Sequence, residues 1–115
     1  MTDTNIPALL EELREVEPLL WEKITYLDQG DRVIKFAYQV LDDFALDHLQ
    51  GCIQRAIAAR KWCGWVGNTE KVYFSEIQTK GAASRLENHE ISFAQADTPA
   101  AAILAAYIEA KRARQ

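Results

Sequence analysis

The stretch WCGWVGNTEKVYFSEI, residues 62–77, decides the fold. Its two ends, 62–66 and 72–77, are rich in aromatic and β-branched residues, and turn-forming residues separate them. This pattern is typical of a β-hairpin. We expect its turn at Gly67 and Asn68, between two antiparallel strands.

Downstream of the hairpin, the sequence predicts a third strand and a closing helix. Residues 91–96 alternate in polarity and follow a polar segment, 78–90, which we expect to be a loop. Thr98 is a favourable N-cap, and Pro99 suits the first helical position behind it. A helical stripe also precedes the hairpin, so residues 46–115 are predicted to form an α-β-β-β-α unit.

The first 30 residues have a helical pattern. Apolar residues spaced by three or four predict an amphipathic helix over residues 5–17. Pro18 should end it, because proline disfavours helical geometry in the residue before it. A second short helix would then run from Pro18 to Leu27, and residues 29–31 would stop it and cap the next helix.

Residues 31–61 are compatible with more than one structure. The apolar positions of 33–44 follow a helical period, although 33–38 is also rich in β-formers, and we favour the helix. One helix, two helices, or a strand followed by a helix all stay open. The chain is predicted to be a single α+β domain, residues 1–115. Its helical half, 1–45, would be an arm or subdomain beside a three-stranded antiparallel sheet, and the C-terminal helix would pack on that sheet.

The composition is that of a globular protein. Of 115 residues, 49% are hydrophobic, which is enough to bury a core. The longest stretch without a charge, residues 98–108, is too short to span a membrane. The N-terminal sequence has no basic region followed by an apolar one, so we expect no signal peptide. Two cysteines then indicate reduced thiols in a cytoplasmic protein.

The charge is distributed unevenly along the chain. The net charge is −4, and residues 1–50 hold 11 of the 17 acidic residues but only 4 of the 13 basic ones. Residues 97–102, at the start of the last helix, contain no lysine, unlike the same position of double-stranded-RNA-binding domains. Together these features disfavour direct nucleic-acid binding.

No arrangement of residues indicates catalysis. The two histidines, His48 and His89, lie in different kinds of segment, and no nucleophile motif accompanies either. His48 and Cys52 are one helical turn apart, and Cys63 lies in the hairpin, but the paired spacing of a zinc site is missing. We therefore predict a protein that is not an enzyme, with no metal and no cofactor. We expect Cys52 to be buried and His48 to lie on the surface.

Three segments resemble small proteins of tailed bacteriophages. They are WCGW at 62–65, YFSEI at 73–77 and AQADTPAAAILAAY at 94–107. They are similar to the phage ABA sandwich group, and the resemblance covers residues 46–113. Its motifs are structural, so no functional residue is carried over from it. The resemblance implies a phage-encoded accessory protein in the host cytoplasm that binds and inhibits a host protein, for example as an anti-defence protein of the anti-CRISPR type.

We therefore expect a non-enzymatic protein that binds a host protein or complex. Its contact residues would be acidic side chains of the N-terminal helices, facing a basic surface: Glu11, Glu12, Glu15, Glu17 and Glu22.

Two alternatives stay open. The first is a small-ligand binder that sequesters a nucleotide signal through cations and tryptophans: Arg60, Lys61, Trp62, Trp65, Lys71 and Arg85. Against it, we favour packing of both tryptophans in or beside the core. The second is a structural or assembly protein that associates through the apolar faces of residues 5–45. A homo-oligomer is compatible with every one of these functions.

Overall fold

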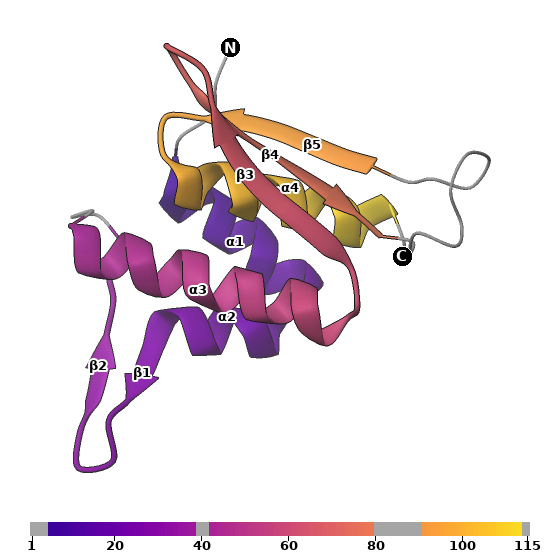
Figure 1. Ribbon diagram of the computed structural model, residues 1–115. Helices are drawn as coiled ribbons and strands as arrows, with labels where there is room; N and C mark the ends of the chain where they lie inside the picture. Colours follow the sequence, from indigo (N-terminus) through magenta and orange to yellow (C-terminus); the bar gives the residue numbers. More distant parts are fainter. Residues whose placement is uncertain (1–4, 39–41, 80–90, 114–115) are drawn as a thin grey trace.

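The computed structural model describes residues 5–38, 42–79 and 91–113, and it has an α+β fold (Figure 1). The elements follow in the order α1 (Ile6–Val16), α2 (Pro18–Thr25), β1 (Tyr26–Asp28), β2 (Val33–Lys35), α3 (Asp43–Ala59), β3 (Cys63–Asn68), β4 (Tyr73–Gln78), β5 (Ile91–Ala96) and α4 (Pro99–Ala113). The predicted fold class is confirmed, with a small two-stranded sheet added to the helical N-terminal half.

The predicted hairpin and third strand form an antiparallel sheet in the order β3-β4-β5. The predicted position of the first turn is wrong, because Gly67 and Asn68 pair with Phe74 and Tyr73 inside the strands. The turn lies later, where the Thr69 hydroxyl accepts hydrogen bonds from the backbone N–H groups of residues 71 and 72. The side chain of Thr69 therefore sets the end of β3. Of the predicted loop at 78–90, residues 80–90 lie outside the described residues.

Helix α4 covers one face of this sheet, which we call the inner face. It contacts β3, β4 and β5 on one side and α1 and α3 on the other, so it lies at the centre of the molecule (Figure 1). The predicted cap is confirmed, since the Thr98 hydroxyl accepts a hydrogen bond of 3.1 Å from the Ala101 N–H. Small side chains let α4 approach the sheet closely, and nearly all of them are fully buried.

The break between the first two helices is confirmed. Helix α1 ends at Val16, Glu17 has an extended backbone, and Pro18 opens α2. The apolar stripe of α1 packs on α4 and joins one continuous core with α3 and the sheet. The apolar stripe of α1 is thus covered within the chain itself, whereas Leu19, Val33 and Phe44 of the same segment stay exposed.

The helix favoured over residues 33–44 is wrong. Leu27 pairs with Ile34 in a hairpin of β1 and β2, and Gly30 forms its turn with a φ of 87°. The Asp28 carboxylate accepts a 2.8 Å hydrogen bond from the Gly30 N–H, so residues 29–31 make a hairpin turn and not a helix cap. Of the structures left open for 31–61, the chain adopts a strand followed by one helix.

Helix α3 begins at its own cap and is not interrupted. The Asp42 carboxylate accepts a 2.8 Å hydrogen bond from the Ala45 N–H, which fixes the N-terminus of the helix. Gly51 lies inside the helix without ending it. Residues 39–41 lie outside the described residues.

Candidate functional site

The outer face of the three-stranded sheet carries a row of exposed aromatic side chains. Strand alternation and register place Trp65, Glu76 and Phe93 side by side on β3, β4 and β5. Phe74 and Ile91 belong to the same face. Trp65 is 51% exposed, Phe93 45% and Ile91 53%. Among the described elements, α3 and α4 contact the sheet, and both do so from its inner side. We call Trp65, Phe74, Glu76, Ile91 and Phe93 the aromatic face.

The rings of the aromatic face contact one another across all three strands. Trp65 meets Phe74 edge-on with ring centroids 5.4 Å apart, and Phe74 stacks on Phe93 at 6.0 Å. Gly67 makes room for this row, since a Cβ there would lie 2.7 Å from the Phe74 ring. A contiguous apolar patch of this kind marks an interaction site more often than scattered exposed side chains do.

Glu76 places one carboxylate in the middle of these rings. Its cross-strand neighbours are Trp65 and Phe93. Within the described residues it is half-buried and forms no ion pair. A carboxylate between aromatic rings favours a partner that brings a cation to it.

The predicted acidic contact residues divide into two groups. Glu11, Glu15 and Glu22 are exposed on α1 and α2, as the prediction requires. Glu12 forms a 2.8 Å ion pair with Arg112 of α4. Glu17 is half-buried in a network within the chain, so only three of the five carboxylates lie free of internal ion pairs among the described residues.

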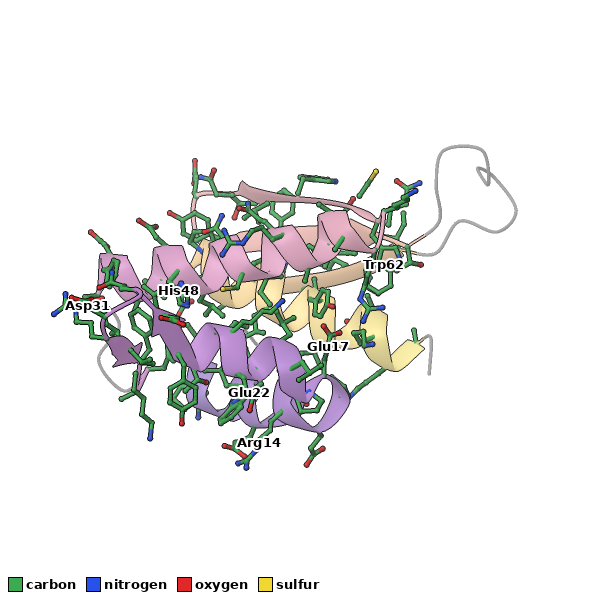
Figure 2. All side chains as sticks on the ribbon, turned by 90° about the horizontal axis from the view of Figure 1, so that it is seen from below. Arg14, Glu17, Glu22, Asp31, His48 and Trp62 are labelled. Carbon is green, nitrogen blue, oxygen red and sulfur yellow. The ribbon has the colours of Figure 1, made fainter. Side chains whose placement is uncertain are left out.

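The Glu17 network joins the α1–α2 junction to α3 and α4. Its carboxylate accepts hydrogen bonds from the Tyr107 hydroxyl at 2.7 Å and the Arg60 guanidinium at 2.8 Å, and Lys111 lies 3.3 Å away. Figure 2 shows Glu17 directed toward α4, on the side where Trp62 lies. Partial burial by itself would raise the pKa of Glu17, but these hydrogen bonds hold it below its ordinary value. The role of Glu17 that the structure shows is structural.

The predicted nucleotide-binding residues are not brought together. Arg60 is engaged by Glu17 and lies over Trp62, whose ring packs near Tyr107 at 5.8 Å. Trp62 is half-buried against the core, as expected, whereas Trp65 is exposed on the aromatic face, which corrects the expectation for that tryptophan.

The remaining cations of that set are scattered. Lys61 is exposed beside the start of β3, and Lys71 is exposed in the β3–β4 turn at the other end of the strand, roughly 20 Å away. Arg85 lies outside the described residues. No shared phosphate site results from the residues that the structure places.

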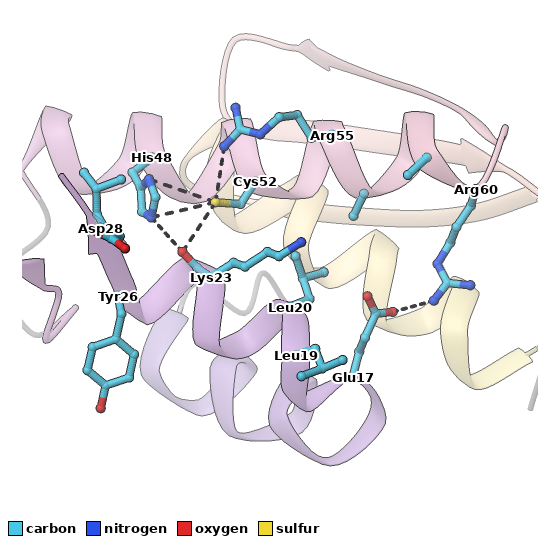
Figure 3. A pocket seen from close by; sticks show the side chains of 13 residues that line it. Glu17, Leu19, Leu20, Lys23, Tyr26, Asp28, His48, Cys52, Arg55 and Arg60 are labelled. Carbon is cyan, nitrogen blue, oxygen red and sulfur yellow. Dashed lines mark hydrogen bonds and ion pairs between the residues drawn. The ribbon is translucent and has the colours of Figure 1, made fainter. Parts of the chain in front are cut away.

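A second candidate site, a groove between α2 and α3, was not predicted from the sequence. The groove has a volume of about 720 Å³ (Figure 3). Cys52 is buried in its wall, as expected. His48 is half-buried and not a surface residue, because its ring stacks on Phe36 at 4.8 Å and its Nε2 lies 3.0 Å from the Lys23 carbonyl oxygen.

The described part of the chain offers neither a metal site nor a membrane-spanning helix. There, no three His, Cys, Asp or Glu side chains gather in a way that could hold a metal ion. None of the helices at 6–25, 43–59 and 99–113 is long and apolar enough to cross a membrane. In the comparisons with known proteins, no family model, no curated protein and no solved structure matches the chain. The resemblance to phage proteins therefore stays a prediction.

Proposed function

We propose that this chain is a non-enzymatic protein-binding module that uses the aromatic face as its contact surface. The observation that carries the proposal is the row of Trp65, Phe74 and Phe93, in mutual contact and left uncovered by the described elements. Aromatic side chains dominate the energy of protein interfaces when a partner desolvates them.

The partner we propose is a protein surface with apolar side chains around one lysine or arginine. Such a cation would pair with Glu76, whose carboxylate lies between Trp65 and Phe93. A second copy of the chain is a poorer fit, because stacking two aromatic faces would bury two Glu76 carboxylates in one interface. A single-stranded nucleic acid would stack on the rings but meet the same carboxylate and a net charge of −4.

The acidic side chains of α1 and α2 supply a second candidate surface. Glu11, Glu15 and Glu22 are exposed, and the internal ion pairs of the described residues do not use them. They would speed the encounter with a basic partner more than they would add to its affinity. That the partner is a host protein, and that binding inhibits it, follows from the phage resemblance alone.

The proposal is tested by affinity capture from bacterial lysate with matched variants, followed by calorimetry with the purified partner. We expect a partner retained in stoichiometric amount by the wild type and lost with Phe93→Ser and with Glu76→Lys. The control is Val33→Ser, which removes an apolar side chain that is 61% exposed on the distant β2. Replacing the partner's basic residue with an acidic one should restore its binding to the Glu76→Lys variant.

Three outcomes would overturn this proposal. One is capture that is equal for the wild type and both aromatic-face variants. Another is loss only when Glu11, Glu15 and Glu22 become lysine, which would move the contact to the acidic helices. The third is binding of a single-stranded oligonucleotide to the wild type that Phe93→Ser abolishes.

A further inference from the structure

The groove between α2 and α3 has the size of a small-molecule site. Its volume of about 720 Å³ lies within the range of known ligand pockets, roughly 300–1,000 Å³. Figure 3 shows the groove running along both helices, with Leu20 and Lys23 on the α2 side and Cys52 and Arg55 on the α3 side.

Small side chains on α3 keep the groove open. Ala56 and Ala59 line it at positions where larger residues would fill the space between the helices. Leu20 supplies a buried apolar wall, and Leu19 stands at the rim with 73% of its surface exposed. The part of the groove between Lys23 and Glu17 is therefore apolar and accessible.

Two cations without acidic partners lie near the middle of the groove, between the Asp28 and His48 end and the Glu17 and Arg60 end (Figure 3). Within the described residues, neither Lys23 nor Arg55 forms an ion pair. The Arg55 guanidinium instead donates to the Cys52 sulfur at 3.5 Å, a weak acceptor. Burial raises the pKa of the Cys52 thiol, even though Arg55 and Lys23 act to lower it, so the sulfur stays neutral at pH 7 and leaves both cations uncompensated.

The acidic groups that line the groove have other partners. Glu17, at one end of the groove, is held by Arg60 and Lys111. Asp28, near His48, accepts the 2.8 Å hydrogen bond of the β1–β2 turn from Gly30. The groove thus has a cationic centre at Lys23 and Arg55, and an apolar stretch at Leu20, Ala56 and Ala59 leads from it toward Glu17.

We propose that this groove binds a small amphiphilic anion, with its carboxylate or phosphate between Lys23 and Arg55 and its acyl chain along Leu20, Ala56 and Ala59. From Cys52 to Ala59, helix α3 rises about 10 Å, which suits a medium-length chain lying parallel to the helices. The site is on the other side of α3 from the sheet and is independent of the aromatic face.

The test is calorimetric titration of the full chain with sodium decanoate below its micelle concentration. Decanol, with the same chain and no charge, and acetate, with the charge and no chain, are the matched ligands. We expect saturable one-to-one binding of decanoate and at least tenfold weaker binding of the other two, because the site needs both parts. Equal binding of decanoate and decanol would overturn the proposed contact of the anion with Lys23 and Arg55.

Two pairs of variants place the ligand. Ala59→Leu should abolish decanoate binding by filling the groove, whereas Ala58→Leu, on the exposed side of the same helix, should leave it unchanged. Lys23→Gln and Arg55→Gln should each weaken binding about fivefold, as expected for partly exposed ion pairs. Lys71→Gln, an exposed cation in the β3–β4 turn, should have no effect.

The outcomes of these variants are decisive either way. Retained binding in Ala59→Leu, or equal weakening in Lys71→Gln, would place the ligand elsewhere and overturn the proposal. Each variant is first checked by circular dichroism, and Ala58→Leu serves as the folding control for Ala59→Leu. Phe93→Ser should bind decanoate like the wild type, so failure of the aromatic-face proposal leaves this one standing.

Discussion

The two faces of the β3–β4–β5 sheet are made from the same strands but have opposite surroundings. On the inner face, Ser75, Ile77 and Ala96 are fully buried beneath α4. On the outer face, Trp65 and Phe93 are about half exposed although they are far larger. Size and hydrophobicity alone therefore do not decide which face is covered. The face covered by α4 belongs to the core, and the uncovered face keeps its aromatic side chains about half exposed.

The largest expected effect compares one residue from each face. Ile77→Ala should lower the free energy of unfolding by about 3 kcal/mol, because it leaves a cavity under α4. Phe93→Ala should lower it by less than about 1 kcal/mol, because the ring loses only its cross-strand contacts. Urea denaturation of both variants measures the difference. Equal losses would mean that the outer rings belong to the core and would remove the basis of the proposed contact surface.

Local pattern predicted the C-terminal half better than the N-terminal half. The third strand and the Thr98 cap depend on neighbours in sequence, and both are confirmed. In the N-terminal half, the confirmed feature of this kind is the break at Pro18. The helix favoured over 33–44 was wrong, because two long-range contacts outweigh the helical period of that segment. One is the pairing of β1 with β2, and the other is the hydrogen bond that the Tyr38 hydroxyl donates to the Ile24 carbonyl.

The candidate sites needed information that one strand or helix cannot supply. Alternation alone assigns Trp65 to one face of β3, but only the register with Glu76 and Phe93 shows that the exposed rings are adjacent. The partners of Glu17 lie 43 and 90 residues away, so its pattern on the helix could not separate a structural carboxylate from an exposed one. The groove likewise depends on how α2 packs against α3.

The second prediction concerns the link between the N-terminal helices and the covered side of the sheet. Glu17→Gln should cost about 1–2 kcal/mol of unfolding free energy at pH 7, since it removes the charge that Arg60, Tyr107 and Lys111 surround. Glu15→Gln, an exposed neighbour on α1, is the matched control and should change stability by less than about 0.5 kcal/mol.

The pH dependence of this effect has a definite sign. The folded chain lowers the pKa of Glu17 from its ordinary 4.5, so the stabilisation is fully present above pH 4.5 and is lost as the pH falls through the folded value. The gap between the wild type and Glu17→Gln should therefore close in acid. A gap that stays constant from pH 7 to about pH 3 would show that the carboxylate charge is not what stabilises the junction.

A smaller effect is expected at the start of the helix that covers the inner face. Thr98→Ala should lower the free energy of unfolding by about 1 kcal/mol, because the Ala101 N–H loses its side-chain acceptor. Thr98→Ser keeps the hydroxyl and should retain most of the stability. Thermal denaturation compares the two. If the serine variant lost as much as the alanine variant, the methyl group and not the cap would be responsible.

The smallest change in stability is expected at Glu76, and it is the one that separates fold from function most sharply. Glu76→Gln keeps the shape of the side chain, and within the described residues the carboxylate has no ion pair to lose, so unfolding should change by less than about 0.5 kcal/mol. The same substitution should weaken binding of the captured partner, because the partner's cation would lose its counter-charge in a desolvated interface. Calorimetry of unfolding measures the change in stability, and calorimetry of binding measures the change in affinity. A variant that lost stability and kept its affinity would make Glu76 a residue of the fold, and the aromatic face would then offer no charge by which to select a partner.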